Sequence, residues 1–343
     1  MPNDLTMVTE LATALGTFPY AGPKEALAAR PSALALDEAT WGRLDALRRD
    51  GRFAAAFAVA FENGRTFLEA DEGLRRRFPQ LVEWTGGRRP PGDEVAPIDL
   101  RIDHVYLVSC KYLSHNISNP SPARLFEGLL ATAGDWERRD WYEASAPAEY
   151  QALYAACRVA SGLSGLPTRA VEMDNEDRRA LRQALPGRRY PPSAEAAYRD
   201  LCRAVSERSA ARWRERLAEA DRERVLWRLL RIGNAPYFLL GTSGEHRLAL
   251  RIDTPWDWRR RFTLRALEVT PAEAGQPQVN WTARYLDRLA GAEGTVDGHV
   301  EIRWSHGKFT QPPEAKVYLD TPAHLLPGYH ELAAPRPQPS LFG

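Results

Sequence analysis

A strand-like run that ends in a lysine places the strongest constraint on how this chain folds. Residues 102–111 read IDHVYLVSCK, and most of them are β-branched, aromatic or otherwise apolar, as is typical of a buried strand. Only four of the 46 lysine and arginine residues are lysines, and one of these, Lys111, ends the run. Burying its ammonium group is costly unless an anionic group meets it. The sequence therefore predicts a sheet in which acidic side chains lie near Lys111.

Composition narrows the class of protein. The chain has 343 residues, enough for two domains, and its apolar content of 44% and charged content of 27% are ordinary for a globular protein. We expect no membrane segment, because no apolar run approaches about 20 residues. We also expect no secretion signal, because residues 1–21 lack a basic start followed by an apolar stretch. Three cysteines without CxxC spacing favour a cytoplasmic location over a disulfide framework or a zinc site.

Charge is balanced overall but unevenly placed. The formal net charge is +1, which does not by itself indicate a nucleic-acid-binding protein. Arginines nevertheless cluster at 75–77, 88–89, 188–189 and 259–261, and the planar arginine fork suits phosphate. Heavy arginine use together with abundant alanine is also typical of GC-rich coding sequence, so no single cluster decides between these two interpretations.

Periodicity divides the chain into three predicted regions, with residues 1–35 only weakly patterned. The predicted helices begin at Asp37 and cover residues 54–78, 123–133, 147–161, 176–185 and 194–232, with Ser121 and Asp174 as N-caps. The predicted strands are 98–111, 237–241, 247–253, 262–269, 279–286, 299–305 and 315–320. The expected fold class is α+β. It comprises a mixed α/β core at 37–135, a helical region at 136–234 packed on that core, and an antiparallel β domain at 235–332.

Acidic residues just upstream of Lys111 indicate metal-dependent chemistry. Cleaving a phosphodiester requires a metal ion that polarises the phosphate and acidifies a water molecule. Asp99 and Asp103 share one parity along their strand, as do Ser109 and Lys111, and a turn near Asp103 would fold the two pieces together. Asp99 or Asp103 would then bind Mg²⁺ or Mn²⁺ with the Cys110 carbonyl, and Lys111 would position the attacking water.

At this point the chain resembles the PD-(D/E)xK nuclease superfamily, the restriction-endonuclease-like enzymes. The matching residues are Pro97-Ile98-Asp99, with Asp103 as the alternative acid, followed by Ser109-Cys110-Lys111. A preceding helix that carries Glu62 and Glu69 belongs to the resemblance, which covers residues 54–132 and implies that one of these glutamates helps to bind the metal. Ser109 departs from the pattern, because the family has a carboxylate there.

Two segments are candidates for contacting nucleic acid. Ser114, His115 and Asn116 follow the Lys111 strand in a polar loop, where a simple strand-to-helix connection is the alternative. The segment 254–261 combines Trp256 and Trp258 with three arginines, Arg259, Arg260 and Arg261. Aromatic rings stack on bases while arginines neutralise phosphates. We expect Trp256 and Trp258 to be exposed, and Trp281 and Trp304 to lie in the core.

A second acidic and basic cluster occurs near the carboxyl end. Glu314-Ala315-Lys316 has the form Glu-x-Lys, and Glu301 lies upstream as a further acid. This cluster ranks below the first, because no glutamate-bearing helix precedes it closely. Its neighbours also have the pattern of antiparallel strands.

The leading hypothesis from the sequence is a Mg²⁺-dependent deoxyribonuclease of restriction or phage-defence type. Its substrate would be DNA, with RNA as the other candidate, and the resemblance implies a homodimer. The first alternative is a non-catalytic nucleic-acid-binding or assembly protein with a degenerate nuclease fold, which Ser109 favours. The second alternative is a structural or protein-interaction module, which the near-neutral charge favours.

Overall fold

The computed structural model describes residues 3–86, 98–112, 116–131, 139–187, 189–243 and 246–333. The chain forms two compact units, each built from separate stretches of sequence. Unit 1 comprises residues 1–115, 231–261 and 322–343, and unit 2 comprises residues 116–230 and 262–321. Both helices and sheets are present, so the α+β class expected from the sequence is confirmed.

Unit 1 contains a seven-stranded mixed sheet with the strand order β1-β2-β3-β4-β6-β7-β12. Strands β2, β3 and β4 form an antiparallel meander, and β6 then pairs with β4 in parallel. Parallel neighbours need a long crossover connection, and here that connection contains residues 116–230 of unit 2. The strands are β1 (Leu34–Ala35), β2 (Val82–Trp84), β3 (Leu100–Ile102), β4 (Tyr106–Lys111), β6 (Tyr237–Ser243), β7 (His246–Ile252) and β12 (Tyr329–Glu331).

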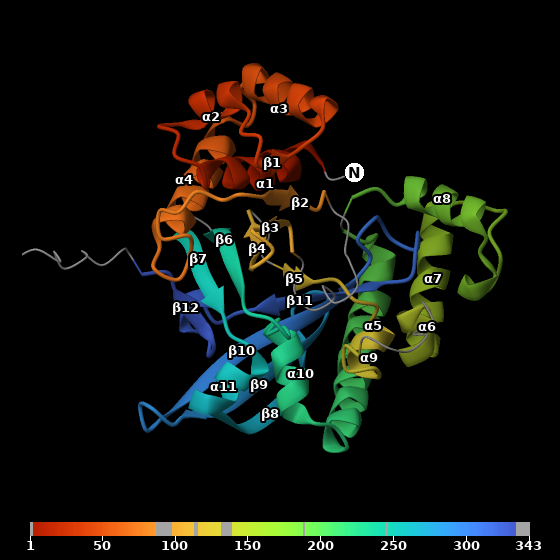
Figure 1. Cartoon of the computed structure of the whole chain (residues 1–343). Coiled ribbons are helices and arrows are strands. Elements are labelled where there is room, and N and C mark those ends of the chain that lie inside the picture. The colour runs from red at the N-terminus through yellow and green to blue at the C-terminus, as the bar shows by residue number, and fades with distance from the viewer. Residues whose placement is uncertain are drawn as a thin grey trace, which may run out of the picture. The chain divides into compact units, whose positions relative to one another are not determined.

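Helices cover one face of this sheet (Figure 1). Helices α1 and α4 lie against the strands, and one buried cluster joins their apolar side chains to Val82, Leu100, Val108 and Leu240 of the sheet. The helices of unit 1 are α1 (Asp4–Gly16), α2 (Pro23–Ala29), α3 (Glu38–Asp50), α4 (Ala54–Glu69), α11 (Pro255–Arg261) and the 3₁₀ turn η2 (Ala323–Leu325). This buried cluster holds α1 and α4 against the strands.

Two glycines allow α1 and α4 to pack closely against each other. A Cβ atom added at Gly16 would lie 2.0 Å from the carbonyl oxygen of Phe61, and one added at Gly64 would lie 2.0 Å from that of Thr13. Only glycine permits backbones to approach this closely. The two helices therefore touch backbone to backbone, which holds the polar residues of both helices over the same part of the sheet.

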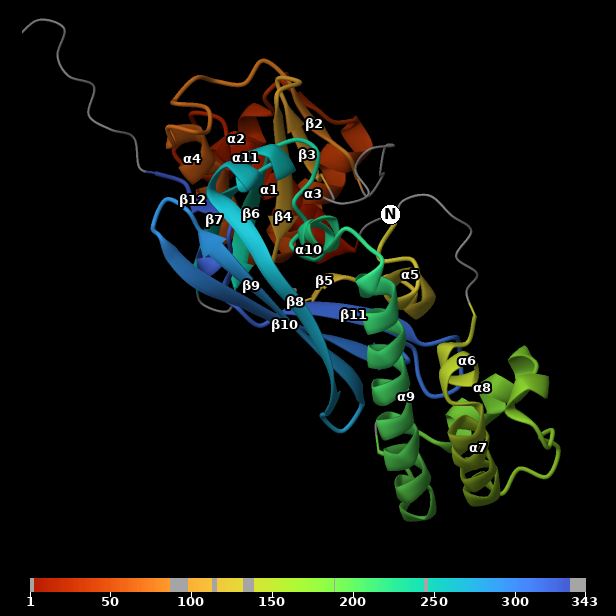
Figure 2. The same cartoon turned by 90° about the horizontal axis from the view of Figure 1, so that it is seen from below.

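Unit 2 combines an antiparallel sheet with a helical layer, as Figure 2 shows. The sheet has the order β5-β11-β10-β9-β8, and α9 lies between strands β8 and β9 and helix α7. The strands are β5 (Asn116–Ser118), β8 (Phe262–Glu273), β9 (Pro277–Asp287), β10 (Ala292–Arg303) and β11 (Glu314–Leu319). The helices are α5 (Pro122–Phe126), α6 (Trp141–Ser145), α7 (Pro147–Ser161), α8 (Asn175–Ala184), α9 (Pro192–Ala218), α10 (Arg222–Leu229) and the 3₁₀ turn η1 (Ala170–Glu172).

Several elements differ from the sequence-based expectation. The expected core at 37–135 and β domain at 235–332 do not coincide with the two units, because β6 and β7 join the sheet of unit 1. Helix α4 ends at Glu69 instead of continuing to 78, and α5 covers only Pro122–Phe126 of the helix expected at 123–133. Helix α1 lies in the stretch that appeared weakly patterned.

Candidate functional site

The Asp99 side chain lies against the end of β4. Strands β3 and β4 form the expected hairpin, in which Leu100 pairs with Val108 and the turn contains Asp103 and His104 at positive φ. Just before β3, the Asp99 carboxylate accepts a 2.6 Å hydrogen bond from the backbone N–H of Cys110. The Asp99 carboxylate thus accepts the N–H of Cys110, the residue before Lys111, as a carbonyl of a neighbouring strand otherwise would.

A second carboxylate, which the sequence analysis did not identify, comes from α1. Glu10 is only 6% exposed, and its Oε2 accepts a 2.6 Å hydrogen bond from Nε1 of Trp84 on β2. Burial and then the nearby charge of Asp99 raise the pKa of Glu10 to about 8, although the Trp84 hydrogen bond lowers it. Near neutral pH, therefore, Glu10 carries a proton that a cation bound beside Asp99 would displace.

The Cys110 side chain packs against the buried cluster that joins α1 to the sheet. Burial, followed by the charges of Asp99 and Glu10, raises the pKa of its thiol well above the ordinary value. The side chain therefore stays a neutral thiol, which is a poor ligand for a hard cation such as Mg²⁺. The ligand expected from Cys110 is its backbone carbonyl oxygen. In a strand, the C=O and N–H of one residue point to the same side, so this carbonyl points to the side on which the Cys110 N–H meets Asp99.

A hydrogen-bonded chain fixes the residue after Lys111. The Asn63 amide donates to the Tyr112 hydroxyl over 2.9 Å and to the Gly241 carbonyl over 3.0 Å. The Tyr112 hydroxyl also lies 2.9 Å from Oγ1 of Thr13, which donates to the Thr9 carbonyl. Since Thr13 has only one hydroxyl proton, Tyr112 is the donor to Thr13. Helices α1 and α4 together anchor the end of β4.

Lys111 is half-buried and pairs in register with Gly241 of β6. Alternation along the strand sends Lys111 and Ser109 to the face opposite Cys110. Ser109 is only 2% exposed. Lys111 therefore extends from the face of the sheet opposite the one that α1 and its Glu10 cover.

Three acids expected at the site lie elsewhere. Asp103 is at the far end of the hairpin from Asp99, where its Oδ1 accepts the backbone N–H groups of Gln80 and Leu81. Glu69 is exposed at the end of α4, and Glu62 lies 3.8 Å from Arg65 in an ion pair. The polar side chain that α4 directs to the sheet is Asn63, so the structure gives these three acids no part in a site built on Asp99.

Most of the segment between β4 and β5 lies outside the described residues. Ser114 and His115, both expected to contact nucleic acid, belong to that stretch. Asn116 begins β5 of unit 2, where it pairs in register with Tyr318 of β11. The expected contact of Asn116 with substrate remains a prediction.

The segment rich in tryptophan and arginine is a helix, α11, and not the expected loop. Trp256 is 72% exposed, as expected, but the expected exposure of Trp258 is wrong, because its side chain is fully buried. Arg259 and Arg260 are exposed and Arg261 is half-buried. Residues three and four apart share a helix face, so Trp256, Arg259 and Arg260 form one exposed surface, the α11 face.

The second acidic and basic cluster lies on β10 and β11 of unit 2. Glu301 pairs in register with Lys316, and Arg303 pairs with Glu314. Lys316 Nζ lies 2.9 Å from Glu314, and Arg303 lies 3.1 Å from Glu301. Each acid thus has a basic partner within an antiparallel sheet, so these residues neutralise one another and present no bare carboxylates to a metal.

Among the residues that the structure describes, no three His, Cys, Asp or Glu side chains gather as a metal-binding group. Mg²⁺ does not require three, because it keeps several waters and is commonly held by one or two carboxylates. Glu10, Asp99 and the Cys110 carbonyl would offer only oxygen donors, the kind of ligand that Mg²⁺ prefers.

Comparison with protein-family models, curated proteins and solved structures finds no match to this chain. Within the described residues, no helix combines the length and apolar character that crossing a membrane requires.

Neither Glu10 nor Asn63 stands out in the sequence, and the reason is the same for both. Both occur in apolar helices, where Glu10 is the one buried charged residue of α1 and Asn63 is the one buried polar residue of α4. A glutamate within the otherwise uncharged run Met7–Gly16 was the available signal, because charged side chains are seldom buried without a partner.

Proposed function

We propose that this protein is a metal-dependent nuclease that hydrolyses phosphodiester bonds, with its active site on unit 1. The observation that carries the proposal is the position of Asp99, whose carboxylate lies 2.6 Å from the Cys110 N–H at the end of the strand that finishes with Lys111. Glu10 adds a second carboxylate close enough for the Asp99 charge to raise its pKa.

Asp99, Glu10 and the Cys110 carbonyl would hold the Mg²⁺ or Mn²⁺ ion. The bound ion supplies Lewis-acid polarisation of the phosphate and a more acidic water. Glu10 must lose its proton to become a ligand, so metal affinity is expected to rise with pH. Trp84 orients the Glu10 carboxylate through its indole N–H.

Lys111 would supply the positive charge that stabilises the developing negative charge on the phosphate and orients the attacking water. Asn63, Thr13 and Tyr112 hold the end of β4. This support matters because a displacement of about 1 Å at a catalytic group is costly in rate.

The α11 face supports a polymeric substrate. An exposed tryptophan beside two exposed arginines combines base stacking with phosphate neutralisation. We propose DNA as the substrate, with RNA as the alternative that a direct comparison tests. A homodimer and a cytoplasmic location are further parts of this proposal; the three free cysteines support a reducing compartment.

The test is cleavage of supercoiled DNA in about 10 mM Mg²⁺ or Mn²⁺, a concentration that saturates weak metal sites. Asp99→Asn and Lys111→Ala should each lower the rate by at least about a hundredfold, the scale of a lost catalytic group. Glu69→Gln is the matched control, because its side chain is exposed at the end of α4, and it should cleave like the parent. Parent-like cleavage by both site variants, with folding confirmed by circular dichroism, contradicts the proposal.

The buried Ser109 favours one alternative, a binding protein with a degenerate nuclease fold. Ser109 occupies the position of the family's carboxylate and is only 2% exposed. Calorimetric titration with Mn²⁺ separates the two functions. Metal binding that Asp99→Asn abolishes supports the nuclease, whereas salt-dependent DNA binding without metal binding supports the alternative.

A further inference from the structure

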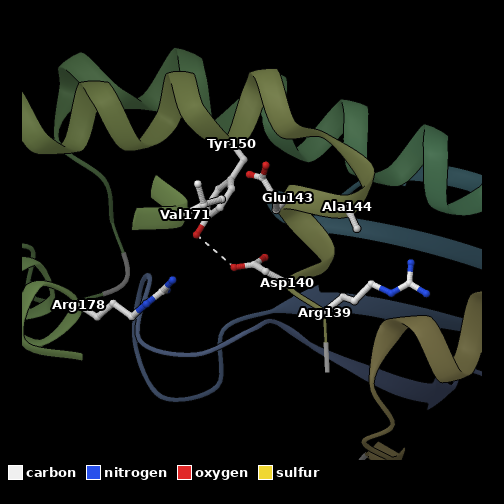
Figure 3. A pocket seen from close by; sticks show the side chains of 7 residues that line it. All are labelled: Arg139, Asp140, Glu143, Ala144, Tyr150, Val171 and Arg178. Carbon is white, nitrogen blue, oxygen red and sulfur yellow. Dashed lines mark hydrogen bonds between the residues drawn. The ribbon is translucent and has the colours of Figure 1, made fainter. Parts of the chain in front are cut away.

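A pocket in the helical layer of unit 2 is independent of the candidate active site (Figure 3). It encloses about 450 Å³, within the range typical of small-molecule sites. Residues from α6, α7, η1 and α8 line it together with the segment before α6. The lining includes Arg139, Asp140, Glu143, Tyr150, Val171 and Arg178.

Asp140 is the central acceptor of this pocket. Its Oδ1 accepts the backbone N–H of Tyr142 over 3.0 Å, and its Oδ2 accepts the Tyr150 hydroxyl over 3.2 Å. The backbone N–H of Glu143 also favours the charged form of this carboxylate. A carboxylate offers about four lone-pair sites, so the Tyr142 and Tyr150 donors leave acceptor capacity for a ligand. Burial raises the pKa of Asp140, opposed by these hydrogen bonds and by the charge of Arg178.

Glu143 supplies a second acceptor in the same pocket. Its side chain is half-buried, and Figure 3 shows its carboxylate beside Tyr150 and directed away from Asp140. Two carboxylates at one pocket can accept N–H donors from different positions of a single ligand. A ligand that fits both acids therefore carries more than one N–H group.

Arginines flank the central acceptor. In Figure 3 the Arg139 and Arg178 side chains lie on either side of Asp140. Arg178 is half-buried, donates to the Phe309 carbonyl over 2.8 Å and also interacts with the Tyr150 hydroxyl. These two contacts do not use all five N–H groups of a guanidinium. Guanidinium groups bind phosphate in a bidentate manner. Val171, 44% exposed, adds an apolar wall.

We propose that this pocket binds a nucleotide, with N–H donors of the base on Asp140 and Glu143 and the phosphate on Arg178 or Arg139. Guanine supplies two N–H positions and a flat apolar face, and the phosphate supplies the anion that arginine forks recognise. Inorganic phosphate alone lacks the donors, and a nucleoside lacks the anion. The proposal stands apart from the nuclease site, because every residue it uses lies in unit 2.

The test is calorimetric titration of the full chain with 5′-GMP, chosen because guanine presents two adjacent N–H donors. AMP, CMP and UMP are titrated alongside, with guanosine and inorganic phosphate as partial probes. A nucleotide should bind more tightly than either partial probe. Arg178→Ala, Arg139→Ala and the pocket-filling Val171→Trp should each weaken binding by about tenfold or more, the scale of a lost charged hydrogen bond.

Arg169→Ala is the matched control, because Arg169 precedes η1 and is exposed outside the pocket lining, and it should bind like the parent. Asp99→Asn should also leave nucleotide binding unchanged, which separates this proposal from the nuclease. The proposal is overturned if no nucleotide binds at millimolar concentration, or if Val171→Trp and both pocket arginine variants bind like the parent.

Discussion

The carbonyl oxygen of Lys111 lies 1.8 Å from the position that a Cβ atom on Gly241 would occupy. The two residues are register partners in the parallel pair of β4 and β6. No side chain larger than a hydrogen atom fits between them, so the residue at 241 controls how closely the two strands approach at the candidate active site.

We therefore expect Gly241→Ala to destabilise the protein by several kcal/mol, because the methyl group forces β4 and β6 apart. The measurement is the free energy of unfolding in urea. Gly42→Ala is the control, since nothing lies within 4 Å of its added Cβ and it occupies helix α3. There alanine should stabilise by about 1 kcal/mol. Equal effects of the two substitutions would show that the close approach is absent.

Glu10 should make the free energy of unfolding depend on pH. The unfolded chain loses this proton near pH 4.5, and the folded chain loses it near 8. Between these values the folded state holds a proton that the unfolded state has lost, so the free energy of unfolding should fall as pH rises, by up to about 1.4 kcal/mol per pH unit. Glu10→Gln should flatten this fall in urea titrations from about pH 5 to 8. An unchanged slope would contradict the raised pKa.

Asp103 is expected to matter for stability and not for metal binding. Asp103→Ala removes the acceptor of two backbone N–H groups, those of Gln80 and Leu81. The loss should lower the free energy of unfolding by about 1 to 3 kcal/mol while leaving the Mn²⁺ affinity at its parent value. A loss of metal affinity in a variant that still folds would show that Asp103 is a metal ligand.

The α11 face should contribute to DNA affinity in two distinguishable ways. Arg260→Ala should reduce the slope of log K against log salt by about 1, because one phosphate contact is lost. Trp256→Ala should weaken binding by about 1 to 3 kcal/mol with the slope unchanged, because stacking is lost. Fluorescence anisotropy with a labelled oligonucleotide measures both. The control is Arg179→Ala, because Arg179 is exposed on α8. If this variant changed the salt dependence as much as Arg260→Ala, the α11 face would not be a specific DNA contact.

Local patterns predicted local elements well. The strands expected from residue 237 to 320 are present as β6 to β11, helix α7 matches its expected range, and Asp174 caps α8 with a reciprocal bond to Asp177. These features depend on side-chain alternation, capping and Pro or Gly punctuation, all of which lie within a few residues of sequence.

Long-range features did not follow from local patterns. Every residue of α1 from Met7 to Gly16 is buried, so this helix lacks the polar face that reveals an amphipathic helix. The pairing of β4 with β6 joins residues about 130 positions apart, which no periodicity encodes. Trp258 is buried because two residues of helix turn it about 200° away from Trp256.

The arrangement of β4 and β6 has a consequence for biosynthesis. Asp99 and Lys111 are translated early. Strand β6, which pairs with the Lys111 strand, is translated only after the whole of 116–230. The proposed active site, which depends on the pairing of β4 with β6, can therefore form only when more than two thirds of the polypeptide exists.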